Sequence, residues 1–282
     1  MAILILDGHP VEYTQTGPSV TSSVTSLVTS LVTSATANHA PSPDLLLVHS
    51  LLTELTVFEK VLPALAADRR VTCINLPGFG ASTALTLDGL EAQADHVARV
   101  MAALKLPANT AVFGNGFGAF VTLQLAIRHG AQFGNLIVAD CVPAFPEAAR
   151  VPFRGMAGKV NETGMGAVLD TAIGRMFPPA FQAAHPEVIA DRKAKLGKVD
   201  AGCFGRACLA LAGMDLTPLL PSIRNRTLVM CGALDLTTPP TLAQQVAQAI
   251  PGARYEDIAD SGHCPMLEQP AALVTAMRGF LG

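Results

Sequence analysis

A glycine-rich turn holds the position from which a nucleophile would act. The segment 114–118 reads GNGFG, follows the apolar stretch TAVFG and leads into a helical pattern. Its spacing matches the strand-turn-helix motif G-x-S-x-G, whose central residue attacks a carbonyl carbon. Here the central residue is Gly116, and the segment contains no Ser, Cys or Asp. The motif therefore predicts a nucleophile position that carries no side chain.

The acid and the base that would serve such a site follow later in the chain. GALDLTTPP places Asp235 after an apolar stretch, and SGHCPMLEQP places His263 on a later loop. This order, acid and then histidine, is the one that the motif requires. An imidazole takes up and returns a proton, while a buried carboxylate fixes its tautomer and stabilises its charged form. We predict Asp235 as the acid and His263 as the base, and we favour Asp235 over Asp140, which also ends a predicted strand.

Two backbone N–H groups would have to form an oxyanion hole for the negative charge that develops during attack. One is predicted at Phe117, directly after the centre of the turn, where a helix dipole assists. The other is predicted in the turn 49–52, with Leu51 as the favoured donor. Ser50 in the same turn is a conceivable nucleophile, but we favour the role of a turn hydroxyl for it.

The scaffold that positions these residues is predicted to be an α/β fold with a mainly parallel, doubly wound sheet. Apolar runs of strand length alternate with helical segments, which is typical of such sheets. The predicted strands are 2–6, 11–16, 44–50, 71–77, 110–114, 135–141, 226–232 and 253–259, with helices at 87–104, 117–129 and 241–249 among others.

The alternation stops between 142 and 221, where Pro and Gly interrupt helical pieces that carry Phe and Met. We predict a helical cap there, over the carboxyl edge of the sheet where open α/β sheets bind ligands. The core is then formed by residues 1–141 and 222–282. The predicted pocket-lining residues are Ser50, Phe145, Met176 and Phe177.

Composition excludes several classes of protein. Half of the residues are hydrophobic, 15% are charged and the net charge is -3, which favours a compact globular protein and gives no sign of nucleic-acid binding. The six cysteines have irregular spacing, so neither a disulfide framework nor a zinc site is indicated. We expect no metal, no cofactor and no membrane partner, and the lack of a signal-peptide pattern predicts a cytoplasmic protein.

One insertion does not fit the alternation. Val20–Ala37 is a near-repeat of four residues in which ten of eighteen are Ser or Thr. β-Branched residues and Ser/Thr disfavour an isolated helix, and the segment is too polar for a membrane span. We predict a low-complexity surface loop over 18–43, with a helix that contacts a partner or a membrane as the alternative.

Six segments between Asp44 and the C-terminus carry a resemblance to a known family. They are HSLLTELTVFEKVLPALAADRRVTCINLPGFGAS, the turn 114–118, MFPPAFQAAHPEVIADRKAKL, GCFGRACLALAGMDL, GALDLTTPP and SGHCPMLEQP. In these segments the chain resembles the 3-oxoadipate enol-lactonases of the α/β-hydrolase superfamily. The resemblance implies a Ser nucleophile at position 116, Asp235 as acid, His263 as base, and hydrolysis of a small anionic enol-lactone or ester. The chain departs from that family at Gly116, in the Val20–Ala37 insertion, and in a cap without Trp.

The glycine leaves three accounts of the site. The chain is a hydrolase that lost its nucleophile by a Ser→Gly change and now is inactive or traps substrate, which we favour. Alternatively it is a ligand-binding pseudo-hydrolase, or it uses His263 and Asp235 in a cofactor-free reaction without a covalent intermediate. The turn also fits the dinucleotide fingerprint G-x-G-x-x-G/A, but a nicotinamide site would leave GALDLTTPP and SGHCPMLEQP unexplained. In each favoured account the partner is a small molecule.

Overall fold

The computed structural model describes residues 1–18 and 42–282. The predicted loop at Val20–Ala37 lies outside the described residues. Among the helices that the model does describe, none combines the length and the apolar character that crossing a membrane would need.

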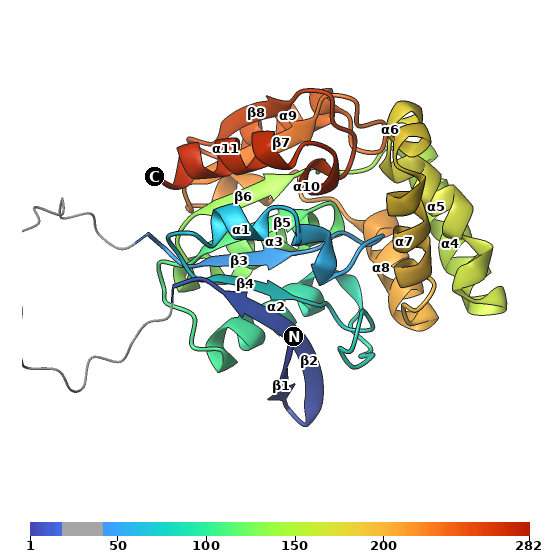
Figure 1. Ribbon diagram of the computed structural model, residues 1–282, viewed down its shortest axis with the longest axis horizontal. Coiled ribbons are helices and arrows are strands. Elements are labelled where there is room, and N and C mark those ends of the chain that lie inside the picture. Colours follow the sequence, from blue (N-terminus) through green and yellow to red (C-terminus); the bar gives the residue numbers. More distant parts are fainter. Residues whose placement is uncertain (19–41) are drawn as a thin grey trace, which may run out of the picture.

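A single eight-stranded sheet forms the centre of the described chain (Figure 1), with the strand order β1-β2-β4-β3-β5-β6-β7-β8. The first two strands pair antiparallel with each other and β2 pairs antiparallel with β4, whereas all the other pairings are parallel. The strands are β1 (Ala2–Leu6), β2 (His9–Thr16), β3 (Leu45–Val48), β4 (Val71–Ile74), β5 (Ala111–Asn115), β6 (Leu136–Ala139), β7 (Thr227–Gly232) and β8 (Arg254–Ile258).

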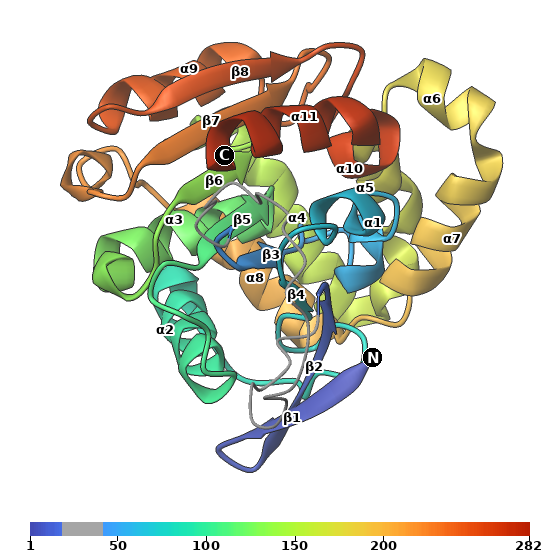
Figure 2. The same ribbon diagram turned by 60° about the vertical axis from the view of Figure 1, so that its left-hand side comes forward.

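The central strands are buried on both faces because helices cover both sides of the sheet. Every residue of β3 to β7 is buried, which is why these strands read as continuous apolar runs. Figure 2 shows α2 and α3 packed side by side on one face and α1 and α11 on the other. The flanking helices are α1 (Leu62–Leu65), α2 (Gly89–Ala103), α3 (Phe117–His129), α9 (Pro240–Ala249), α10 (Pro265–Glu268) and α11 (Pro270–Leu281).

Five further helices lie between β6 and β7 in the chain and gather at one end of the sheet (Figure 1). We call the segment 147–213 the helical segment. It stands beyond the ends at which the parallel strands finish. Its helices are α4 (Glu147–Thr163), α5 (Leu169–Met176), α6 (Pro179–Ala184), α7 (Pro186–Leu196) and α8 (Ala201–Gly213).

The predicted fold class is therefore confirmed. Each predicted strand is present within a few residues of its expected bounds, and the helix predicted at 117–129 has those bounds. The assignment of 142–221 as a separate cap on a core of 1–141 and 222–282 stays a prediction about domain organisation.

Candidate active site

The glycine-rich turn joins β5 to α3 and adopts a conformation that favours glycine. Gly116 has φ 53° and ψ -118°, in the left-handed region that side chains rarely enter. A Cβ on Gly114 would collide with the backbone of Gly118, and one on Gly118 would collide with the carbonyl of Val48. The outer glycines thus allow the helix to approach the strands closely, while the central one permits the sharp turn.

His263 lies on the loop between β8 and α10, and backbone hydrogen bonds fix this loop on both sides of it. The Glu268 carboxylate accepts the Gly262 N–H at 2.7 Å and the Cys264 N–H at 2.9 Å. The His263 N–H donates to the carbonyl of Met176 at 3.0 Å, where α5 ends. The imidazole is therefore held by its own loop and by the helical segment.

Asp235 follows β7 and lies against the imidazole. Its Oδ2 is 2.8 Å from His263 Nδ1, and its Oδ1 accepts the N–H groups of Thr237 at 2.7 Å and Thr238 at 3.1 Å. The Thr238 hydroxyl also donates to the carboxylate. These contacts leave Nε2 of His263 as the nitrogen that faces the turn at β5.

Burial and pairing act in opposite directions on the two groups. Burial disfavours the charged imidazole, but the Asp235 carboxylate outweighs it and raises the pKa of His263 to about 9. Burial likewise disfavours the charged carboxylate, yet His263 and the hydrogen bonds around it lower the pKa of Asp235. The pair therefore stabilises the imidazolium that forms once the imidazole has taken up a proton.

Asp140, the competing acid, sits next to this pair but does not contact the imidazole. Its carboxyl accepts the Gly232 N–H at 2.8 Å and an Asn115 side-chain N–H at 2.7 Å. Burial, with repulsion from Asp235, raises the pKa of Asp140 to about 8. Asp140 therefore holds its proton near neutral pH and is poorly suited to orient His263.

Position 116, the predicted nucleophile position, lies directly beside His263. A Cβ built on Gly116 would stand 2.8 Å from His263 Nε2 and 3.0 Å from the Cβ of Ser50, and would collide with the Ser50 hydroxyl, so the imidazole and the Ser50 side chain would both have to shift to admit it. A residue with a hydroxyl at 116 would thus reach the imidazole, as the motif predicts.

Two backbone N–H groups remain available at the predicted oxyanion hole. Within residues 1–18 and 42–282, neither Phe117 N–H nor Leu51 N–H donates a hydrogen bond to a protein acceptor. Phe117 opens α3, whose first turn presents such unpaired donors and the positive end of the helix dipole. Both residues line the cavity that contains Gly116.

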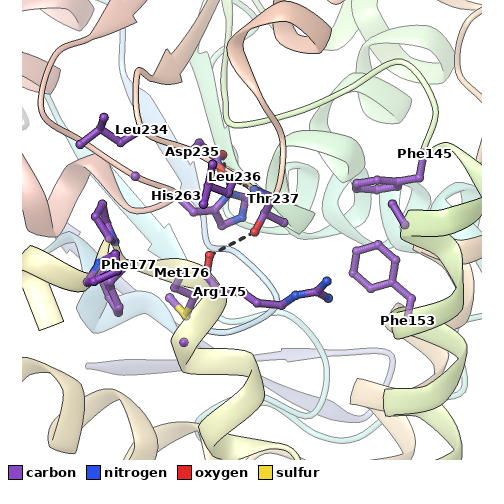
Figure 3. A pocket seen from close by; sticks show the side chains of 15 residues that line it. Phe145, Phe153, Arg175, Met176, Phe177, Leu234, Asp235, Leu236, Thr237 and His263 are labelled. Atoms are coloured by element: carbon purple, nitrogen blue, oxygen red, sulfur yellow. Dashed lines mark hydrogen bonds and ion pairs between the residues drawn. The ribbon is translucent and has the colours of Figure 1, made fainter.

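This cavity has two adjoining parts. The inner pocket, about 40 Å³, is bounded by the turn at Gly116, by Ser50 and by His263. The outer pocket, about 360 Å³, leads from His263 to the surface between α5, α6 and the loop after β7 (Figure 3). The predicted pocket residues all line one part or both: Ser50 the inner, Phe177 the outer, and Phe145 and Met176 both.

Sequence reasoning left other residues out of the predicted pocket. The sequence offers Arg175, with Arg150, Arg154 and Arg206, as a possible carboxylate ligand in or near the cap but favours solvated surface for each. In the structure Arg175 is exposed to solvent, and its side chain extends across the outer pocket toward Phe153 (Figure 3) and lines both parts. Thr237 and Thr238 bind the acid and line the inner pocket. An Asp followed two and three residues later by Thr is a turn pattern that could have indicated these two contacts. Nothing in the local sequence indicates that the Arg175 side chain lines the pocket.

One group of side chains in the described ranges has the composition of a metal site. Asp140, Cys231 and Asp235 offer ligand atoms within 4.8 Å of one another. Burial raises the pKa values of the Cys231 thiol and of the Asp140 carboxyl, so both hold protons that a metal would have to displace. Asp235 is already engaged by His263, so we assign no metal to this group.

The fold and the site together define a class: an α/β protein with an acid-histidine pair at the carboxyl ends of its strands, opposite a turn in the geometry of a nucleophile elbow. Residues 45–276 match the model of the alpha/beta hydrolase family, and the chain belongs to that family.

Its relatives include hydrolases of esters and lactones. The chain is 30% identical over 243 residues to a pimeloyl-[acyl-carrier protein] methyl ester esterase of Aromatoleum aromaticum, covering 81% of this chain and 94% of that one. It is 28% identical to polyketide synthase ThaQ of Burkholderia thailandensis, of which it spans only 12%.

Solved structures agree with this assignment. The enol-lactonase from Burkholderia xenovorans LB400 superposes with a TM-score of 0.84 at 25% identity, covering 99% of each chain. A thermophilic esterase from Thermogutta terrifontis, with malate bound, gives 0.82 at 26% identity, covering 97% of this chain and 93% of that one.

Proposed function

We propose that this chain is built to hydrolyse a small, anionic lactone or ester by a Ser-His-Asp type mechanism, and that Gly116 leaves it inactive or able only to trap substrate. The observation that carries the proposal is the hydrogen-bonded pair of His263 and Asp235 facing the empty side-chain position at 116. Loss of a catalytic serine costs up to ~10⁶ in kcat, so we expect hydrolysis by this chain to be very slow.

In the complete mechanism each residue has a defined part. A hydroxyl at position 116 attacks the carbonyl carbon while its proton passes to His263 Nε2, and the N–H groups of Phe117 and Leu51 bind the oxyanion. Collapse of the intermediate expels the alkoxide or enolate, which takes the proton from His263. Water then attacks the acyl-enzyme with His263 as base, and releases the acid.

Arg175 supports an anionic substrate. Its side chain lies in the pocket wall, and in the described part of the chain the guanidinium makes no ion pair or hydrogen bond with another side chain. A guanidinium that lacks a partner beside a cavity is a ready ligand for a carboxylate. The enol-lactonase and the malate-bound esterase among the similar structures are consistent with such a ligand.

The size of the cavity supports a small reacting group. The inner pocket beside Gly116, about 40 Å³, accommodates a short acyl group. A dinucleotide bound to the same turn would have to place its pyrophosphate in this small space. The nicotinamide alternative gains no support from this geometry.

The experiment is to introduce the missing hydroxyl. We expect Gly116→Ser to raise kcat/KM for small carboxylate-bearing esters and lactones by about 10³ or more. Gly116→Ala is the matched control, because it adds the same Cβ and backbone strain without the hydroxyl. Equal rates for the two folded variants across a panel of esters and lactones would refute the proposal and favour a binding protein.

A further inference from the structure

Ser50 has a hydroxyl that its own turn does not use. The turn after β3 is closed by Thr53: its N–H donates to the Ser50 carbonyl at 3.2 Å, and its hydroxyl accepts the Ser50 N–H at 3.1 Å. His49 Nδ1 lies 2.7 Å from the same carbonyl. Within the described ranges, the Ser50 Oγ itself has no hydrogen-bond partner on the protein. The role of turn hydroxyl that we predicted for Ser50 is thus filled by Thr53.

The free hydroxyl lies in the space that a nucleophile at position 116 would occupy. Ser50 is 1% exposed, and the surface it retains lines the inner pocket. Its Oγ and His263 Nε2 are the two nearest atoms to the Cβ position of Gly116, so both border the same small space. A side chain at 116 would fill this space, whereas glycine does not.

We propose that Ser50 acts as a substitute nucleophile in the chain as it stands, with His263 as its base. This inference rests on the proposed function, since it uses the same pair, the same oxyanion donors and the same class of small ester or lactone. It differs in the atom that attacks, and it assigns a covalent step to a chain whose usual nucleophile is absent.

The chemistry of the step balances without a cofactor. Ser50 Oγ forms a bond to the carbonyl carbon, and its proton moves to His263 Nε2 as the carbonyl oxygen becomes an oxyanion. The unpaired N–H of Phe117 at the start of α3 is available to that oxyanion. The bond to the leaving oxygen then breaks, and that oxygen takes the proton from His263. Water later cleaves the acyl-Ser50 ester, with the same imidazole accepting and returning a proton.

No hydrogen bond joins Ser50 Oγ to His263 Nε2 in the described structure. The two atoms must therefore approach each other when substrate binds. Hydrogen bonds of catalytic groups often tighten only in the complex. We therefore expect slow turnover, far below that of Gly116→Ser, but above the rate of a chain that lacks the Ser50 hydroxyl.

The experiment is covalent trapping in the unaltered chain. A fluorophosphonate reacts with an activated serine, whose oxygen displaces fluoride and forms a stable phosphonyl ester. Cleavage after Asp and Glu releases LLLVHSLLTE, residues 45–54, in which Ser50 is the single serine. The panel is the unaltered chain, Ser50→Ala, His263→Ala, Gly116→Ser, and the surface variant Ser222→Ala as control.

The expected result is phosphonylation of the 45–54 peptide in the unaltered chain and in Ser222→Ala. Labelling should be lost in Ser50→Ala and strongly slowed in His263→Ala, with turnover of a small ester falling about 100-fold in Ser50→Ala. Ser50→Cys, which keeps a nucleophile at the position, should retain a covalent reaction, now with a thiol reagent.

Two results would overturn the inference about Ser50. The first leaves the proposed function intact, and the second overturns the proposed function too. If position 116 is labelled in Gly116→Ser but the 45–54 peptide stays unlabelled in the unaltered chain, the proposed function stands and Ser50 is not a nucleophile. If neither variant is labelled or turns over esters while both remain folded, the proposed function fails as well.

Discussion

Removing the guanidinium of Arg175 should change which esters the site accepts. Arg175 reaches across the outer pocket and is exposed to solvent. The change is Arg175→Met, made in the Gly116→Ser background so that turnover is measurable. Met keeps the unbranched stem that packs along the pocket and removes only the charge.

The magnitude follows from the contact that is lost. A hydrogen bond to a charged group contributes about 1.5 to 3 kcal/mol, and the exposure of Arg175 places it at the low end of that range. Each 1.4 kcal/mol corresponds to about tenfold in binding. We therefore expect kcat/KM for an ester bearing a carboxylate to fall about tenfold, and for a neutral ester of equal size to change less than about threefold.

The assay compares the 4-nitrophenyl ester of succinate with that of butyrate. Arg154→Met is the matched control, because Arg154 also lies in the helical segment but is paired with Glu147 and does not line either pocket. Two outcomes would contradict the assignment of Arg175 as the carboxylate ligand. One is an equal fall in kcat/KM for both esters in Arg175→Met. The other is a loss of the preference for the succinate ester in Arg154→Met as well.

Three further predictions concern the groups around the turn. Gly116→Ala should lower the free energy of unfolding by about 1 to 3 kcal/mol, since φ 53° is unfavourable with a Cβ and the Cβ would collide with the Ser50 side chain. Adding Ser50→Gly, which removes the collision with the Ser50 side chain, should recover part of the loss in melting temperature. An unchanged melting temperature in Gly116→Ala would refute the strain. In Asp140→Asn, the free energy of unfolding should increase relative to that of the unaltered chain as pH rises from 4 to 8. The reason is that the folded pKa of Asp140, about 8, exceeds the unfolded value of 3.8, so that ionisation of Asp140 favours the unfolded state over this range. Equal pH profiles of the two proteins in urea titrations would contradict this. In Gly116→Ser, kcat/KM should rise between pH 7 and 9, because the pKa of His263 is raised to about 9 and the base must be neutral. A profile that levels off near pH 6.5 would show that the pairing with Asp235 does not raise the pKa of His263.

The same pKa makes a prediction about stability. His263 has a folded pKa above its unfolded value of 6.5, so its pairing stabilises the fold fully below pH 6.5 and loses this effect as pH rises toward 9. In His263→Gln this part of the pH dependence should be absent when unfolding is followed in urea. An unaltered profile would indicate that other groups dominate that range.

The elements that position the site were predictable because their signals are local. Continuous apolar runs such as LLLV and LIVA predict strands buried on both faces, and parallel strands bring their carboxyl ends to one edge. The order of the turn at Gly116, Asp235 and His263 along the chain then predicted that these residues meet, and the structure places them together.

What could not be predicted depends on contacts between distant segments. Among residues 1–18 and 42–282 the hydroxyl of Ser50 has no hydrogen-bond partner, because Thr53 closes the turn. It lies beside Gly116 because β3 and β5 are neighbours in the sheet. Arg175 lines the pocket at the end of α5, where the His263 N–H donates to the Met176 carbonyl and the Thr237 hydroxyl donates to the Arg175 carbonyl. Neither arrangement has a signature in local spacing or composition.

The central claim is that the remaining acid and base can still serve a nucleophile at position 116. The most direct test is the ratio of kcat/KM for Gly116→Ser to that for Gly116→Ser/His263→Ala on one small carboxylate-bearing ester. We predict a ratio of about 10³ or more, because serine without its base is a weak nucleophile. A ratio near one, with both proteins folded, would show that the pair of His263 and Asp235 does not act on this position.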